Sequence, residues 1–148
     1  MIRAHRLSSL KYPNNSGVGA SIHGGRWNPK GVEVIYAAGS PSLAALEILV
    51  HFSVLPAGYG LTAIDIPDGL VEVLTDSRLP TDWDALVALR ATRDLGGRWA
   101  RSRRSAVLSV PSSVMPVERN FAINPNHPDF PQITFSAARP FSFNLRLK

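Results

Sequence analysis

The chain has 148 residues, and 16 Lys and Arg against 11 Asp and Glu give a formal net charge of +5. It contains no cysteine, which excludes disulfides, thiolate catalysis, iron–sulfur clusters and cysteine-based zinc sites. Its length, 45% apolar share and 18% charged share are typical of one globular domain rather than of a disordered chain, so we expect a single domain over residues 1–148.

Neither the start of the chain nor its longest uncharged stretch is typical of a membrane protein. The charged start, Met1–Arg6, has no apolar segment behind it, unlike a signal peptide. The stretch Ile48–Ile64 is interrupted by Pro56, Gly58 and Gly60, which would break a membrane-spanning helix. We therefore expect a soluble, cytoplasmic protein with no membrane partner.

The predicted elements are short, because twelve prolines and eleven glycines are spread along the chain. Alternating or β-branched runs predict strands at Ile2–Leu7, Glu33–Ala38, Leu61–Ile66, Leu70–Leu74, Ala106–Val110, Asn120–Asn124, Ile133–Phe135 and Pro140–Leu145. Residues Lys11–Gly25 are rich in Pro, Asn, Ser and Gly, and we predict a loop there. These patterns favour a mixed α+β fold.

Two helices are predicted. The first covers Pro41–Phe52, with Ser40 as its N-cap and a proline at its first position. The second covers Trp83–Leu95 by the spacing of its leucines and arginines, with Thr81 or Asp82 as its cap.

Glu47 is the most unusual residue of the first helix, because it lies among leucine, isoleucine and valine. A carboxylate is costly to bury unless it is paired or hydrogen-bonded. Either Glu47 faces water or pairs with an arginine for structural reasons, or it is an active-site carboxylate that faces a cleft.

Other polar residues also have two interpretations. Arg26 lies in a glycine-flanked turn and forms either a surface salt bridge or an anion clamp. Tyr36 is a core aromatic or stacks on a ligand ring, while Ser112 and His127 are turn residues or ligand contacts. The basic cluster, Arg98, Arg101, Arg103 and Arg104, is a solvated face or a contact surface for an acidic partner or nucleic acid.

Familiar site motifs are lacking. The four histidines have no metal-ligand spacing, and no phosphate-binding loop, dinucleotide-binding glycine motif or nucleophile elbow occurs.

Several segments together resemble the RES domain, in the order and at the spacing of that family. The first block comprises Gly24–Asn28, Val34–Ala38, Ser42–Glu47 and His51. The second half is similar at Ala106–Ser112, at Asn120–Pro125 and at His127–Pro128, and Arg6 matches an arginine that the family carries in its first strand. The resemblance covers nearly the whole chain.

The resemblance implies a toxin of a bacterial toxin–antitoxin pair, with an Xre-type helix-turn-helix antitoxin as partner and DNA reached only through that antitoxin. It implies an ADP-ribosyltransferase-like fold, with mixed sheets and a few helices around an NAD cleft. NAD is expected as a substrate, with phosphate as a candidate co-substrate and no resident cofactor or metal. Cleavage at the nicotinamide bond, by phosphorolysis or hydrolysis, is the implied activity, and some relatives transfer ADP-ribose to a protein instead.

Carried over by position, the catalytic residues of the family fall on Glu47, Arg26, Tyr36 and Ser112. Arg6 and Asn124, together with Arg26 and Tyr36, are then expected to bind NAD. Ser113 follows directly, so either serine can be the serine of the motif.

Two alternatives come from other classes of protein. The net charge, the basic cluster and His51 also fit a basic toxin that acts on RNA without consuming NAD. A module that binds NAD without turnover is the second alternative.

Overall fold

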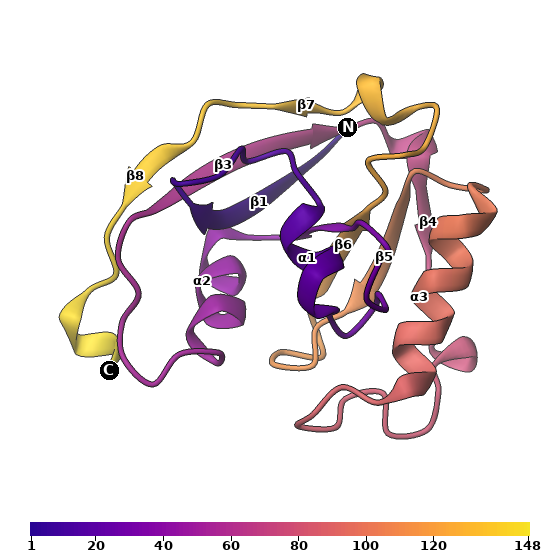
Figure 1. The fold of residues 1–148 in the computed structure, drawn as a ribbon, viewed down its shortest axis with the longest axis horizontal. Helices are drawn as coiled ribbons and strands as arrows, with labels where there is room; N and C mark the ends of the chain where they lie inside the picture. Colours follow the sequence, from indigo (N-terminus) through magenta and orange to yellow (C-terminus); the bar gives the residue numbers. More distant parts are fainter.

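The computed structural model describes every residue from Met1 to Lys148 and has one mixed sheet with three α-helices and four short 3-10 helices (Figure 1). The strands are β1 (Ile2–Ser9), β2 (Ile35–Ala38), β3 (Tyr59–Ile66), β4 (Val71–Val73), β5 (Val107–Pro111), β6 (Arg119–Ile123), β7 (Thr134–Phe135) and β8 (Arg139–Phe141). The helices are α1 (Val18–His23), α2 (Pro41–Leu49) and α3 (Arg90–Ser102). The predicted mixed α+β class is confirmed.

The strands of the sheet change direction between β1 and β2. Its strand order is β4-β5-β6-β2-β1-β3-β7, with β8 also paired to β3, and only the β4–β5 pair is parallel. Strands β1 and β3 pair along their full lengths, whereas β1 meets β2 only where His5 faces Ala38. In Figure 1, β1 and β3 accordingly run across the upper part of the molecule, while β5 and β6 descend steeply on the right.

One face of the sheet carries a continuous apolar core. Its buried members come from five strands and from the loop positions just before β5 and β7: Ala4, Ile35, Ala37, Ile64, Ile66, Ala106, Val107, Phe121, Ile123 and Ile133. Phe130 and Phe135, from the C-terminal part of the chain, pack against it.

The opposite face has two separate cores, one under each long helix. Helix α2 packs on Leu7 and Ala38, together with Phe143 from beyond β8. Helix α3 packs through Trp99 on a second set of residues, which are Trp27, Val34, Leu74, Leu108, Val110 and Ala122. Between these two cores lies a stretch of β2 and β6 that neither helix covers fully. The polar side chains of Glu47, Ser112 and Asn120 meet there.

Helix α2 begins as its sequence predicts. Ser40 accepts a hydrogen bond at 3.1 Å from the N–H of Leu43, so it is the N-cap, and a proline follows it. The helix ends at Leu49, earlier than the predicted Phe52.

The second predicted helix was wrong in its position. Residues 83–89 are not helical, α3 begins only at Arg90, and the expected cap Asp82 has a left-handed backbone with φ of 57°. The leucines that suggested the helix are exposed, Leu86 fully. The buried side of α3 is instead Thr92, Gly96, Gly97, Trp99 and Ala100.

Two further predictions need correction. The predicted loop Lys11–Gly25 contains α1, a helix of six residues. The last predicted strand, Pro140–Leu145, is a strand only as far as Phe141, and Leu145–Leu147 form a 3-10 turn. No helix has the length and apolarity needed to cross a bilayer.

Candidate active site

Glu47 lies at the boundary between the two cores and is held by neutral polar groups. It points from α2 toward β6, where its Oε2 accepts hydrogen bonds from the side-chain amide of Asn120 and, at 3.4 Å, from the hydroxyl of Ser112. Asn120 faces Ala38 of β2 and Val110 of β5 in the sheet register. No arginine pairs with Glu47, so the structural ion pair considered for it is not formed.

The two oxygens of the Glu47 carboxylate differ. Oε2 has both donors, while Oε1 has no hydrogen-bond partner in the protein and is not among the buried atoms that lack one. Oε1 is therefore the oxygen that remains open to solvent and to a ligand.

Ser112 is fixed by its own turn. The residue is fully buried, and its hydroxyl oxygen accepts hydrogen bonds from the backbone N–H groups of Val114 at 3.1 Å and Met115 at 2.9 Å. With these two donors in place, the hydroxyl hydrogen is left for Glu47. Ser113 makes no such contact, so Ser112 is the serine that adjoins the carboxylate.

Tyr36 holds the glycine-flanked turn against β2. Its hydroxyl donates to Oδ1 of Asn28 at 2.6 Å and accepts from the N–H of Trp27 at 3.1 Å. Burial raises the pKa of Tyr36, although the hydrogen bond from Trp27 and the charges of Arg26 and Arg93 act in the opposite direction. The phenol is therefore neutral across the working pH range and keeps its O–H donated to Asn28.

Arg26 follows two glycines in a turn with the predicted sharp bends, since Gly24 has φ of 75° and Gly31 has φ of 88°. Its guanidinium donates to the backbone carbonyls of Trp83 at 2.8 Å and Ala85 at 2.9 Å. It forms neither the salt bridge considered for it nor a contact with Glu47. Two of its five N–H groups thus fix the loop before α3, and the others remain free for an anion.

Arg6 is a half-buried cation without an anionic partner. Its Nη1 donates to the carbonyl of Tyr36 at 2.9 Å, and its Nε is buried without a hydrogen-bond partner. Burial lowers the pKa of Arg6 to about 10. Since an uncompensated buried charge is costly, a site that keeps one is suited to an anionic ligand.

Asn124 lies away from this group. Its amide donates to the carbonyl of Ala100 at 2.9 Å and its Oδ1 accepts from the N–H of Asn126, so both ends of the side chain are used. The length of β6 separates it from Asn120, roughly 13 Å at the rise of a strand. Asn124 lines a pocket of about 500 Å³ beside the end of α3 instead, and its expected role in NAD binding stays a prediction.

Another pocket, of about 340 Å³, lies at β4 and is bordered by Glu72, Arg104 and His127. His127 accepts a hydrogen bond at Nδ1 from the N–H of Asp129, as a turn histidine does. Neither pocket borders Glu47, Arg26 or Tyr36.

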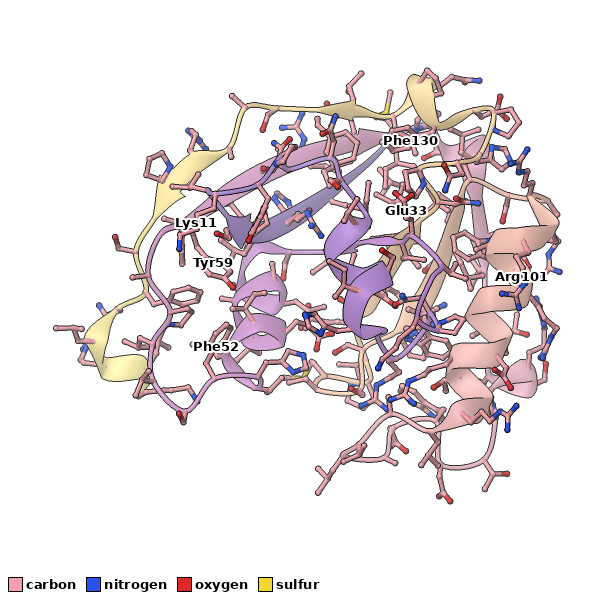
Figure 2. The ribbon with its side chains drawn as sticks, in the orientation of Figure 1. Lys11, Glu33, Phe52, Tyr59, Arg101 and Phe130 are labelled. Carbon is pink, nitrogen blue, oxygen red and sulfur yellow. The ribbon has the colours of Figure 1, made fainter.

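The basic cluster divides into two parts. Arg104 pairs with Glu72 at 2.9 Å, while Arg98, Arg101 and Arg103 are exposed and make no ion pair. Figure 2 labels Arg101 on α3, far from Phe52 and Tyr59 at the α2 end of the molecule. Whether this part of the surface binds a partner stays a prediction.

The site thus brings together Glu47 and Ser112 directly, and joins Arg6 and Arg26 to Tyr36 by hydrogen bonding and proximity. Tyr36 and Ala38 are two residues apart on the same face of β2, which links both groups along one strand. Asn120 was not predicted as a site residue. A signal for it existed, because a polar amide stands at the start of the apolar run Phe121–Ile123.

Comparisons with known proteins show the family of the chain. Residues 1–144 match the RES domain. The chain is 44% identical over 137 residues to the Prs ADP-ribosylating toxin of Sphingobium sp. (strain YBL2), covering 89% of this chain and 85% of the relative. It is 42% identical to a Toxin Res of Yersinia enterocolitica, with 90% of each chain covered.

A solved structure has a similar fold. A chain of the Mycobacterium tuberculosis MbcT–MbcA toxin–antitoxin complex superposes with a TM-score of 0.75 at 20% identity, covering 95% of this chain and 84% of the other.

Proposed function

The chain belongs to the RES domain family, and on this premise we propose that it is a toxin that cleaves the nicotinamide–ribose bond of NAD. The observation that carries the proposal is the Glu47 carboxylate, with one oxygen held by Asn120 and Ser112 and the other open. Two arginines supply positive charge near β2, because Arg6 donates to the carbonyl of Tyr36 and the charge of Arg26 acts on the Tyr36 phenol.

The reaction needs only one carboxylate. The nicotinamide of NAD already carries a positive charge and leaves as a neutral base, so the general acid of an ordinary glycosidase is dispensable. Positive charge then develops on the ribose. The open Oε1 of Glu47 stabilises that charge or binds the ribose hydroxyls, and such preorganised electrostatics lower a barrier by several kcal/mol.

The arginines are assigned to the diphosphate. Arg6 has an unused buried N–H, and Arg26 has N–H groups that its loop contacts do not use, so both can donate to phosphate oxygens. Tyr36, a neutral phenol, holds the turn that carries Arg26, and we assign its ring to contact with the nicotinamide or the ribose.

We propose phosphate or water as the acceptor of ADP-ribose, which makes the reaction a phosphorolysis or a hydrolysis. A protein acceptor is the second candidate, and the name of the Sphingobium relative, an ADP-ribosylating toxin at 44% identity, favours it.

The test is incubation of the purified chain with NAD, with and without phosphate, followed by mass spectrometry of the products. Nicotinamide should appear together with ADP-ribose or its phosphorylated form. Glu47→Gln, which keeps the shape and removes the charge, should lower release to a small residual rate, while the control Glu33→Gln, whose carboxylate borders the pocket near α3, should leave the rate unchanged. No nicotinamide from folded protein under either condition would refute the proposal, and labelled NAD that marks an added protein would select the second candidate.

We further propose an Xre-type helix-turn-helix antitoxin as the partner and the bacterial cytoplasm as the location. The fold shared with a chain of a toxin–antitoxin complex supports an antitoxin partner. Co-expression with the neighbouring gene and co-purification of its product test this part, and DNA should bind only when that product is present.

A further inference from the structure

We propose that Asn120 is a positioning residue for Glu47, whose side-chain amide fixes one carboxylate oxygen so that the other faces the substrate. The inference rests on the proposed function, and it assigns a task to a residue that was not predicted as a site residue from the sequence.

The contact itself is direct. Nδ2 of Asn120 donates to Oε2 of Glu47, the oxygen that also accepts from Ser112. Two donors on one oxygen define the plane of the carboxylate, because one comes from β6 and the other from the turn after β5, while the acid comes from α2. Oε1 is left without a protein partner and is accessible.

The orientation of the amide is decided by Glu47. The other end of the amide, Oδ1 of Asn120, is buried without any hydrogen-bond partner. A flipped amide would place Oδ1 against the carboxylate, where the two oxygens repel, and would gain no acceptor for Nδ2. Asn120 therefore presents its N–H group to Glu47 in a single arrangement.

A purely structural role would favour a different residue here. Asn120 lies between Ala38 and Val110 in the sheet, at a position where an apolar side chain would leave no buried oxygen without a partner. A buried acceptor that lacks a donor lowers stability, and such groups concentrate where function requires them.

The experiment measures NAD turnover by Asn120→Ala and Asn120→Asp, with Asn126→Ala as the control from beyond the other end of β6. We expect Asn120→Ala to lower kcat about tenfold or more while KM for NAD changes by less than about threefold, since the residue acts through Glu47. Asn120→Asp should lower kcat further, because it places an acceptor oxygen where the N–H donor was. In a Glu47→Gln background, Asn120→Ala should have no additional effect.

Wild-type kcat in Asn120→Ala, or full additivity with Glu47→Gln, would overturn the inference. Failure of the proposed function is a different result, since wild-type protein would then release no nicotinamide. In that event a crystal structure of Asn120→Ala decides: a Glu47 carboxylate turned away from Ser112 supports positioning by Asn120, and an unmoved carboxylate refutes it. Circular dichroism verifies that each variant is folded.

Discussion

Buried polar side-chain atoms without a partner are found at two residues, Arg6 and Asn120, and both adjoin the strands that form the candidate site. Such atoms are expensive in an interior, where nearly every donor and acceptor is satisfied. Their concentration here indicates that local stability is sacrificed for a site that binds an anion and orients a carboxylate.

The first prediction concerns Arg6. Burial without a carboxylate lowers its pKa to about 10, so the folded protein holds a charge that the unfolded chain solvates better. Arg6→Met keeps most of the volume and removes that charge, and we expect the free energy of unfolding to rise by about 1 kcal/mol, or a few degrees in Tm. NAD turnover should fall in the same variant.

Thermal unfolding followed by circular dichroism checks this prediction, with Arg3→Met as the matched control on the same strand. Arg3 is exposed and paired with Asp65, and its removal should change stability little. A greater loss of stability in Arg6→Met than in Arg3→Met would contradict the argument.

At the scale of the element, α2 could be predicted because its signals are local. Its cap, its first-turn proline and its leucines all lie within ten residues of one another. Helix α3 could not, because its middle holds Gly96 and Gly97, which ordinarily weaken a helix. Tertiary contact explains them: a Cβ at Gly96 would lie 1.7 Å from the carbonyl oxygen of Trp27, so only glycine lets the helix approach the turn that carries Arg26.

Gly96→Ala should therefore destabilise the protein severely. The overlap is with backbone that cannot rotate away, so α3 must shift off the turn, and we expect a loss of more than about 3 kcal/mol. Gly19→Ala in α1 is the control, because nothing lies near its added methyl group, and it should be neutral or slightly stabilising. Urea unfolding of both variants measures the difference, and equal midpoints would show that the close approach is not required.

A milder effect is expected at the start of α2. Ser40→Ala leaves the N–H of Leu43 without its partner, and loss of an N-cap costs about 1 kcal/mol. Ser42→Ala, exposed and inside the same helix, should leave stability nearly unchanged. Because the helix carries Glu47, turnover in Ser40→Ala should also decline at temperatures where the helix end frays. An equal loss of stability in Ser42→Ala and Ser40→Ala would show that the N-cap hydrogen bond does not cause the loss.

For the whole molecule, the limit of sequence-based prediction is long-range pairing. The strands were found nearly where they were expected, and Glu47 and Ser112 were both predicted as site residues. That β2 lies beside β6, more than eighty residues later, depends on the sheet order and is not written in any local pattern. The same pairing brings Asn120 to Glu47. Asn120 was therefore missed, although Glu47 and Ser112, which share this contact, were both predicted.

Ion pairs of Glu72 stabilise the edge strand β4 against the rest of the molecule. Because they need an ionised carboxylate, the stability of the protein depends on pH. Glu72 accepts hydrogen bonds from Arg104, Ser105 and Arg78. The hydrogen bond from Arg104 is the main cause that lowers the pKa of Glu72 from 4.5 to about 2. Because the folded value lies below the unfolded one, this contribution is complete above pH 4.5 and is lost as the pH falls toward 2.

Glu72→Gln should thus be less stable than the wild type near neutral pH, by about 1 kcal/mol once the partial exposure of its arginine partners is considered. The difference should narrow between pH 4.5 and 2, where the wild-type carboxyl becomes protonated and loses its ion pairs. Denaturant titrations across this range measure the gap, with Glu33→Gln as the control for removal of a carboxylate that has no ion pair. If the difference in the free energy of unfolding between wild type and Glu72→Gln stays constant with pH, the charge of Glu72 does not stabilise β4. Hydrogen bonding alone would then hold this strand.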